Sequence, residues 1–302
     1  MMDLSVEFAG NVFRNPITVA SGTFGSGIEY SRYIDLEKLG AITTKGVSYE
    51  PWEGNPTPRV TETPSGMMNA IGLQNPGVDV FIARDLKFLE DHNVPVIVNI
   101  CGHSIEEYEA VIEKLSDDDR ICMFEVNVSC PNVKCGAIQF GTDPDMLTEV
   151  TKKCKAKAGS KPVIMKLTPN VTSISDMAKA AESGGADGIS LINTFTAMKI
   201  DIYRKDFVLK NKTGGLSGPA IHPIAVRMVY EASHAVNIPV IGMGGVASCE
   251  DAIEMMMAGA SMVAVGMMNF VSPCTALSVI EGMEKYMEET GTKRIKDIIG
   301  IL

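Results

Sequence analysis

Eight strand-like segments that alternate with helical ones predict an α/β fold, the TIM (β/α)8 barrel. The most regular signal is the tripeptide Pro-Val-Ile, which occurs at 95–97, 162–164 and 239–241 and each time opens a short apolar, β-branched run. Proline is tolerated as the first residue of a strand. Runs that are apolar at nearly every position are typical of parallel strands buried on both faces.

A second repeat, Gly-Ala, alternates with the first. It occurs at 40–41, 185–186 and 259–260, where it closes a helical stretch and leads into a strand. A glycine after a helix supplies a left-handed cap. The predicted strands, in addition to those opening at Pro95, Pro162 and Pro239, cover 17–22, 42–46, 123–129, 188–194 and 262–268.

The sequence also marks the starts of three helices. Capping-box patterns, or their aspartate variant, open helices at Ser104, Ser173 and Ser248. A doubly wound sheet is the weaker alternative, because no G-x-G-x-x-G follows the first strand.

The N-terminal segment 5–13 alternates apolar and polar residues around Ala9-Gly10-Asn11, which predicts a β-hairpin at the bottom of the barrel. No linker or low-complexity tract interrupts the chain. We therefore expect 1–302 to form a single domain with small insertions at the barrel rim.

Composition excludes several classes of protein. The chain has 302 residues, 45% of them hydrophobic and 21% charged, which is ordinary for a soluble globular protein. A formal net charge of −10 argues against nucleic acid as a partner, because phosphate binding needs a basic surface. The seven cysteines include no C-x-x-C pair, which argues against a metal site, an iron–sulfur site or a disulfide framework and favours a cytoplasmic location.

The segment 255–280 contains no charged residue and is long enough to span a bilayer. Gly259, Gly266, Asn269 and Pro273 interrupt it. It reads better as a helix end, a turn, a buried strand and a loop, and the N-terminus lacks the pattern of a signal peptide. No membrane association is expected.

Polar residues and glycines gather where the predicted strands end, which is the catalytic face of this fold. Lys45 and Lys166 end apolar strands, where a buried cation is costly unless an anion meets it. One such lysine could belong to a structural ion pair, whereas two beside several asparagines favour a negatively charged polar ligand. Gly244, Gly245 and Gly266 follow strands seven and eight, the usual phosphate site of a barrel.

Cys130 lies within Asn-Val-Ser-Cys-Pro-Asn, 127–132, at the end of the fourth predicted strand. A buried apolar cysteine is the structural reading, and a thiolate that takes part in catalysis is the functional one. Gly136 and Gly141 bracket a short segment just downstream, which suggests a loop that closes over the site.

These motifs, in this order, resemble the dihydroorotate dehydrogenase family along almost the whole chain. The membrane-bound class has serine at the position of Cys130, so a cysteine there is similar to the soluble class 1 enzymes. The amino-acid sequences of several motifs resemble those of subclass 1B. Cys101 and Cys135 depart from the family pattern. The matching stretches are 20–25, 44–48, 54–59, 69–77, 127–132, 215–219 and 242–245.

The resemblance implies an enzyme of pyrimidine (UMP) biosynthesis that uses FMN to oxidise (S)-dihydroorotate to orotate. Cys130 would be the base that takes the C5 proton, and FMN would accept the C6 hydride. Lys166 would stabilise the negative charge of the reduced ring, and Lys45 would reach both flavin and substrate.

The resemblance also implies the binding residues. Substrate would contact Lys45, Asn69, Ala70, Ile71, Gly72, Leu73, Asn127, Asn193 and Thr194. FMN would contact Ser21, Lys45, Gly46, Asn99, Asn127, Lys166, Ile192, Gly218, Gly244, Gly245, Gly266 and Met267.

Subclass 1B enzymes pass electrons to NAD⁺ through a second subunit that carries FAD and a 2Fe-2S cluster. The resemblance therefore implies a homodimer of this chain within a heterotetramer of two catalytic and two electron-transfer subunits. Quinone and fumarate remain alternative acceptors.

Other functions remain open at this point. A related FMN barrel could act on another dihydropyrimidine, and it would then not need a substrate carboxylate. A non-redox lyase or isomerase acting on a phosphorylated sugar would explain the glycines but would leave Cys130 and the asparagines without a role. A catalytically silent subunit is the least consistent with the complete set of rim residues.

Overall fold

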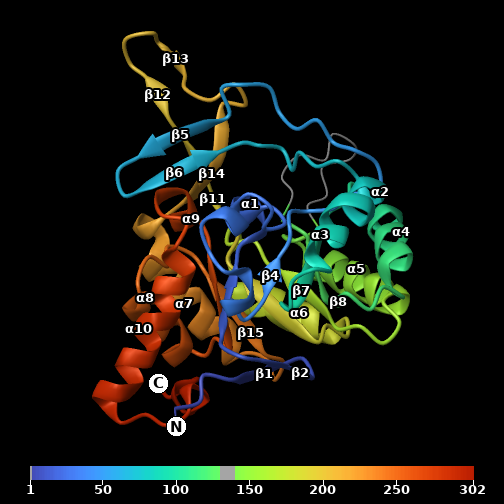
Figure 1. Ribbon diagram of the computed structural model, residues 1–302. Coiled ribbons are helices and arrows are strands. Elements are labelled where there is room, and N and C mark those ends of the chain that lie inside the picture. The colour runs from blue at the N-terminus through green and yellow to red at the C-terminus, as the bar shows by residue number, and fades with distance from the viewer. Residues whose placement is uncertain (1, 130–139) are drawn as a thin grey trace.

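The computed structural model describes residues 2–129 and 140–302. Its centre is an eight-stranded parallel barrel surrounded by helices (Figure 1). The hydrogen-bonded order β3-β16-β15-β10-β9-β8-β7-β4 follows the chain around the barrel, which confirms the predicted fold. The barrel strands are β3 (Ile17–Val19), β4 (Ile42–Thr43), β7 (Val96–Ile100), β8 (Ile121–Asn127), β9 (Val163–Lys166), β10 (Gly188–Leu191), β15 (Val240–Met243) and β16 (Met262–Val265).

The barrel is nearly closed at β3 and β4. Within the described residues these two strands share no ladder. Instead, Gly40 donates its N–H to the Ile17 carbonyl at 2.9 Å, and the Thr18 and Thr43 hydroxyls lie 3.1 Å apart. The closure therefore rests on a few isolated bonds, because β4 is only two residues long.

Several strands end earlier than the sequence predicted. The strand expected over 17–22 stops at Val19, because Ser21–Phe24 forms the short helix α1. Likewise 42–46, 188–194 and 262–268 stop at Thr43, Leu191 and Val265, and 123–129 is shifted to Ile121–Asn127. The apolar pattern continues past the strands because the loop residues are buried too, as at Ile192, which is 3% exposed.

Helices α4 to α8 and α10 cover the outside of the barrel (Figure 1). The three predicted helix starts are confirmed: the side chains of Ser104, Ser173 and Ser248 each accept a hydrogen bond from the backbone N–H three residues on. The helices are α1, α2 (Val78–Val80), α3 (Lys87–Leu89), α4 (Ile105–Leu115), α5 (Pro144–Lys157), α6 (Ile174–Ser183), α7 (His222–Ser233), α8 (Cys249–Met257), α9 (Met268–Val271) and α10 (Thr275–Thr290). A π-helical segment, Phe81–Leu86, joins α2 to α3, and 3-10 turns lie at Tyr30–Arg32, Leu36–Lys38, Pro219–Ile221 and Ile295–Ile298.

The three Gly-Ala glycines differ in role. Gly185 and Gly259 follow α6 and α8 with φ of 90° and 115°, the left-handed conformation expected of them. Gly40 was predicted to do the same and does not. A Cβ there would lie 2.1 Å from the Asn15 carbonyl oxygen, so this glycine permits a close backbone approach.

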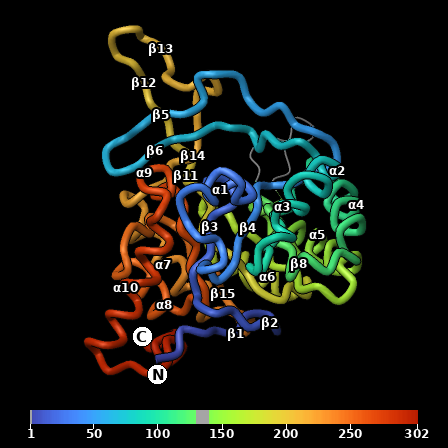
Figure 2. The backbone as a smooth tube through the Cα atoms, viewed as in Figure 1, coloured from blue at the N-terminus to red at the C-terminus, as the bar shows by residue number. Residues whose placement is uncertain are grey.

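The N-terminal hairpin is confirmed as β1 (Val6–Phe8) and β2 (Asn11–Phe13), an antiparallel pair at the bottom of the barrel (Figure 2). Phe8 and Phe13 are each 1% exposed. A Cβ on Gly188, the first residue of β10, would lie 2.8 Å from Phe8 Cζ, so the Phe8 ring closes the amino-terminal end of the barrel.

The opposite end carries more structure than the small insertions expected. The antiparallel sheet β11-β14-β6-β5 stands above the rim, and a hairpin extends beyond it (Figure 1). Its strands are β5 (Val60–Thr63), β6 (Gly66–Asn69), β11 (Phe195–Met198) and β14 (Thr213–Ser217), and the hairpin is β12 (Ile200–Asp201) with β13 (Asp206–Phe207). This rim sheet joins segments far apart in sequence above the strand ends.

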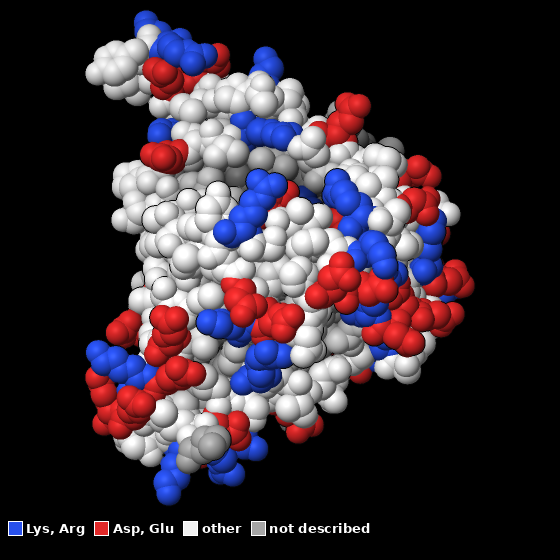
Figure 3. Space-filling view, in the orientation of Figure 1, with Lys and Arg blue, Asp and Glu red and all other residues white. Residues whose placement is uncertain are grey.

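The uncharged segment 255–280 begins as expected with the end of α8, a turn and the buried strand β16, but the loop expected after the strand is instead the short helix α9 and the start of α10. Across the two described ranges, no helix combines the length and apolar character needed to cross a bilayer. On the face seen in Figure 3, acidic and basic side chains are interspersed over the barrel helices.

Candidate active site

A buried polar network lies at the rim on β7, β8, β9 and β10. Glu125, 1% exposed, accepts a hydrogen bond from Asn99 Nδ2 at 2.5 Å and one from Ser190 Oγ at 2.7 Å. Lys166 Nζ lies 3.4 Å from the same carboxylate. Side chains of adjacent parallel strands are brought together here because Glu125 pairs with Asn99 on one side and Ile164 on the other.

Lys166 therefore has its anion within the protein. From the sequence, either rim lysine could belong to a structural ion pair, and Lys166 does. Its side chain is 6% exposed and that of Glu125 is 1% exposed, so both charges depend on each other and on their hydrogen bonds.

Lys45 is in a different position. It follows β4 and is partly buried, and within the described residues no carboxylate forms an ion pair with it. The pKa of its ammonium group is lowered, mainly by burial. Cys101 acts in the opposite direction and raises this pKa, whereas the positive charges of Lys166 and Arg59 lower it further. A cation held here without a counter-ion favours an anionic ligand.

The two asparagines predicted to bind substrate are in contact. Asn193 Nδ2 donates to Asn127 Oδ1 at 3.3 Å, and Asn193 Oδ1 accepts from the Thr194 backbone N–H at 2.8 Å. The Tyr108 hydroxyl donates to the Asn127 carbonyl at 2.9 Å. The structure thus holds the backbone and side chain of Asn127 at the mouth of the barrel.

The rim sheet brings Asn69 to the same region. Asn69 pairs with Gly215 in the ladder between β6 and β14. A Cβ on Gly215 would lie 2.0 Å from Thr194 Oγ1, so Thr194 packs directly against this ladder. Asn69 and Thr194 are 125 positions apart in the chain, yet both lie next to Gly215.

The predicted segment Ala70–Leu73 is organised by Asn55 and Arg59. Asn55 donates its Nδ2 to the Ala70 carbonyl at 3.0 Å and its N–H to the Ile71 carbonyl at 2.9 Å. Ala70 donates its N–H to the Arg59 carbonyl at 2.8 Å. Gly72 packs against Asn55, where a Cβ would come within 2.8 Å. The positive charge of Arg59, which holds this segment, also lowers the pKa of Lys45.

The glycines form a second group on the other side of the barrel. A Cβ on Gly218 would lie 2.6 Å from Met267 Cε, and one on Gly245 would lie 2.9 Å from the Gly218 carbonyl oxygen. Gly244 approaches Ile192, with 3.2 Å from a Cβ to Cγ1. Gly244 and Gly245 have φ of 131° and 73°, conformations that favour glycine.

Gly266 completes this group. A Cβ built on it would meet only Ala20 Cβ, at 3.7 Å, so the space beside its backbone is open. Ala20 donates its N–H to the Val265 carbonyl at 2.8 Å, which also holds the buried Ser21 next to Gly266. Exposed backbone N–H groups of this kind suit a phosphate.

One polar atom of the Glu125 network lacks a partner in the described structure: Asn99 Oδ1 is buried and accepts no hydrogen bond. A Cβ on Gly46 would lie 3.0 Å from this oxygen, so a larger residue at position 46 would crowd it. A buried acceptor without a donor costs free energy, which a ligand N–H would offset.

Cys130, the predicted base, and most of the predicted loop lie in 130–139, outside the described residues. The described residues on either side lie together: a Cβ on Gly141 would be 2.7 Å from the Val128 carbonyl oxygen. Ser129 donates its hydroxyl to the Lys166 carbonyl at 3.2 Å. Ser129, the residue before Cys130, is therefore fixed against the strand that carries Lys166.

Sequence reasoning missed Glu125 and Ser190. The signal was present, since a glutamate inside the apolar run 123–128 carries the same burial cost as a lysine. Arg59 was also missed, because its influence on Lys45 depends on the path of the rim segment.

Comparisons with known proteins identify the family of the chain. The family model "Dihydroorotate dehydrogenase" matches residues 3–287. The chain is 57% identical over 299 residues to "Dihydroorotate dehydrogenase B (NAD(+)), catalytic subunit" of Lachnoclostridium phytofermentans, which covers 99% of both chains. It is 54% identical over 301 residues to the protein of the same name from Alkaliphilus metalliredigens, with 100% of this chain and 99% of that one covered.

A solved structure shares the fold: dihydroorotate dehydrogenase of Eimeria tenella in complex with ferulenol superimposes with a TM-score of 0.84 at 21% identity, covering 99% of this chain and 88% of that one. The barrel, the match over 3–287 and the two full-length relatives agree with one another. The chain belongs to the dihydroorotate dehydrogenase family.

Proposed function

We propose that this chain is the FMN-containing catalytic subunit of an NAD⁺-linked dihydroorotate dehydrogenase. It oxidises dihydroorotate to orotate in pyrimidine biosynthesis. The observation that carries the proposal is the 57% identity, over 99% of both chains, to a catalytic subunit of that name. The charge arrangement at the rim supports it, because Lys45 has no counter-ion in the described structure and the substrate is a carboxylate.

The residues present fit FMN. The backbone of the glycine group, open at Gly266, suits its phosphate, and the unpaired Asn99 Oδ1 suits a ring N–H. When bound, FMN supplies the two-electron acceptor for the hydride that leaves C6 of the substrate. The residues proposed to hold it are Ser21, Lys45, Gly46, Asn99, Asn127, Lys166, Ile192, Gly218, Gly244, Gly245, Gly266 and Met267.

The chain itself binds and orients the substrate. Lys45 offers its positive charge to the carboxylate, and the amides of Asn69, Asn127 and Asn193 offer donors and acceptors to the planar ring. Thr194 and the backbone of 70–73 add further polar groups at the rim. Glu125 keeps the Lys166 ammonium group in place at the site.

The proton from C5 requires a base, and we assign this role to the thiolate of Cys130. The hydrogen bond from Ser129 to the Lys166 carbonyl supports the assignment, because it holds Ser129, the residue before Cys130, at the rim. The Cys130→Ala variant should retain flavin but lose flavin reduction by dihydroorotate. Unchanged reduction in this variant would remove Cys130 as the base.

Electrons leave through a partner. The relatives are named catalytic subunits, which implies a second subunit. We propose that it carries FAD and a 2Fe-2S cluster and joins two copies of this chain in a cytoplasmic heterotetramer. Co-purification of an iron–sulfur flavoprotein from the native source would support this assembly, and a catalytic chain that reduces NAD⁺ alone would contradict it.

The activity is tested by mixing the purified, flavin-loaded protein with dihydroorotate without oxygen. The yellow colour should bleach and orotate should appear in equal amount to the flavin. Dihydrouracil, which lacks the carboxylate, should leave the colour unchanged. A protein that takes up no flavin, or one bleached equally by both compounds, would contradict the proposal.

The phosphate site has its own test. The Gly266→Ala variant places a methyl group in open space at ordinary contact with Ala20, so it should fold as the unsubstituted chain does. Loss of phosphate hydrogen bonds would weaken FMN binding by about 1.5–3 kcal/mol, roughly 10- to 100-fold. FMN affinity measured by fluorescence titration should fall while the melting temperature of the flavin-free protein stays constant; unchanged affinity would place the phosphate elsewhere.

A further inference from the structure

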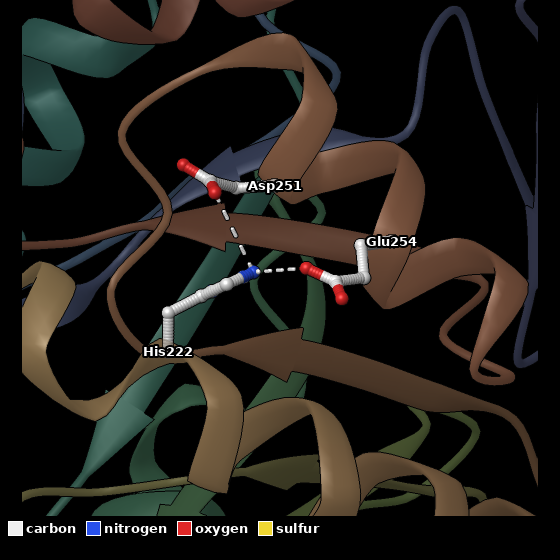
Figure 4. A group of neighbouring side chains, drawn as sticks. All are labelled: His222, Asp251 and Glu254. Atoms are coloured by element: carbon white, nitrogen blue, oxygen red, sulfur yellow. Dashed lines mark hydrogen bonds and ion pairs between the residues drawn. The ribbon is translucent and has the colours of Figure 1, made fainter.

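Three side chains converge away from the rim network described above (Figure 4). His222 is the first residue of α7, and Asp251 and Glu254 lie one turn apart on α8. The Nε2 atom of His222 lies 3.1 Å from Glu254 Oε2 and 3.6 Å from Asp251 Oδ1. One potential ligand atom from each residue lies within 4.8 Å of the others.

The histidine is oriented by its second nitrogen. His222 Nδ1 lies 2.9 Å from the Gly244 carbonyl oxygen, which can only accept a hydrogen bond, so Nδ1 carries the hydrogen. In the neutral ring this leaves the lone pair of Nε2 facing the two carboxylates. A backbone carbonyl that holds one ring N–H while the other nitrogen binds an ion is the usual support of a metal-bound histidine.

Asp251 is oriented in a similar way. Its Oδ2 accepts the backbone N–H groups of Ala247 and Ser248 at 2.8 and 2.9 Å, as part of the capping box of α8. Its Oδ1 faces His222. Two of the three side chains are thus fixed by bonds that leave one atom each directed at a common point.

The charges at this point do not balance. Two carboxylates meet one imidazole, and among the ion pairs of the described residues no lysine or arginine joins Asp251 or Glu254. We propose that His222, Asp251 and Glu254 form a binding site for a divalent transition-metal ion of the Zn²⁺ type.

The spacing agrees with this assignment. Ligand atoms about 2.05 Å from a tetrahedral Zn²⁺ lie about 3.3 Å from one another. The observed separations from Nε2, 3.1 and 3.6 Å, lie on either side of that value. One nitrogen and two carboxylate oxygens are suitable ligands for such an ion, and water would complete the coordination.

The site is accessible from solvent. The side chain of Glu254 is 59% exposed, that of Asp251 27% and that of His222 9%, so an ion can enter from the Glu254 side without unfolding the chain. Cysteine spacing in the sequence gives no sign of this site, because its ligands are a histidine and two carboxylates from two helices.

An ion here would also support the glycine group. A Cβ on Gly245 would lie 2.7 Å from His222 Cβ, and Gly244 accepts the bond from His222 Nδ1. The ion would join α7, α8 and this loop, and it would stabilise the folded chain because it binds the folded state alone.

The test uses the full chain, freed of metal with a chelator and studied without flavin, so that it does not depend on the proposed activity. Zn²⁺ is titrated by calorimetry, and the melting temperature is measured with and without Zn²⁺. The unsubstituted chain should bind one equivalent of Zn²⁺. In the variants His222→Asn and Glu254→Gln the affinity for this Zn²⁺ should fall by about 10- to 100-fold or more.

Glu250→Gln is the matched control, because it removes the same charge from the first turn of the same helix outside the cluster. This variant should keep the equivalent and the Zn²⁺-dependent rise in melting temperature. Equal Zn²⁺ binding by the unsubstituted chain and all three variants would assign the ion to another site, such as a cysteine, and would overturn the proposal. Absence of Zn²⁺ binding by the correctly folded chain would overturn it as well.

Discussion

The two lysine-bearing regions of the rim differ in how their charge is balanced. On β8 and β9, Lys166 is paired with Glu125, and that carboxylate is further held by Asn99 and Ser190. After β4, burial lowers the pKa of Lys45, and neighbouring positive charges lower it further. A charge balanced within the protein is part of the architecture, whereas an unbalanced one indicates where a ligand anion belongs.

The largest effect expected from this difference follows loss of Lys166. Replacing it with methionine leaves the buried Glu125 carboxylate without a cation, which should cost about 3–5 kcal/mol of unfolding free energy. Urea unfolding of the flavin-free protein measures this. Adding Glu125→Gln to the same chain should recover most of the loss, and a double variant as unstable as Lys166→Met alone would show that the pair does not carry the effect.

A smaller effect is expected at Ser190, which donates a hydrogen bond to Glu125 in the Lys166–Glu125 pair. The Ser190→Ala variant loses a hydrogen bond to a buried carboxylate, about 1.5–3 kcal/mol. Thr18→Val is the matched control, since it removes a buried hydroxyl bond to the neutral Thr43 and should cost about 1 kcal/mol. Equal losses in the two variants would show that the hydrogen bond to Glu125 is no stronger than one between neutral hydroxyls.

The sequence predicted the barrel well because strand and helix signals repeat along it. Pro-Val-Ile marks three strands, and Ser104, Ser173 and Ser248 mark three helix starts through local bonds that span only three residues. The rim sheet was not predicted. Its strands are short and partly glycine-rich, and Asn69, Gly215 and Thr194 meet through pairing that no local pattern encodes.

The same limit applies to the candidate site. Lys45 and Lys166 could be identified as unusual from their place in apolar runs, but which of them has an anion depends on the packing of β8 against β9. Glu125 had the same signal and was read as part of a buried strand. The strand ends were placed too late because burial, rather than pairing, extends the apolar pattern through residues such as Ile192.

The central claim is that Lys45 carries a charge that the folded chain does not balance. In the flavin-free protein the unfolded chain then binds this proton more tightly than the folded chain. The free energy of unfolding should therefore rise with pH in the window between the lowered pKa and the ordinary value of 10.5, and below that window the charged Lys45 should be a net cost.

The most direct measurement is the unfolding free energy at neutral pH of Lys45→Met, with the exposed Lys38→Met as control. We expect Lys45→Met to stabilise the flavin-free chain and to abolish its stability gain at high pH, and we expect Lys38→Met to do neither. A Lys45→Met variant that is less stable than the unsubstituted chain would show that the protein already supplies a partner for this charge, which contradicts the account.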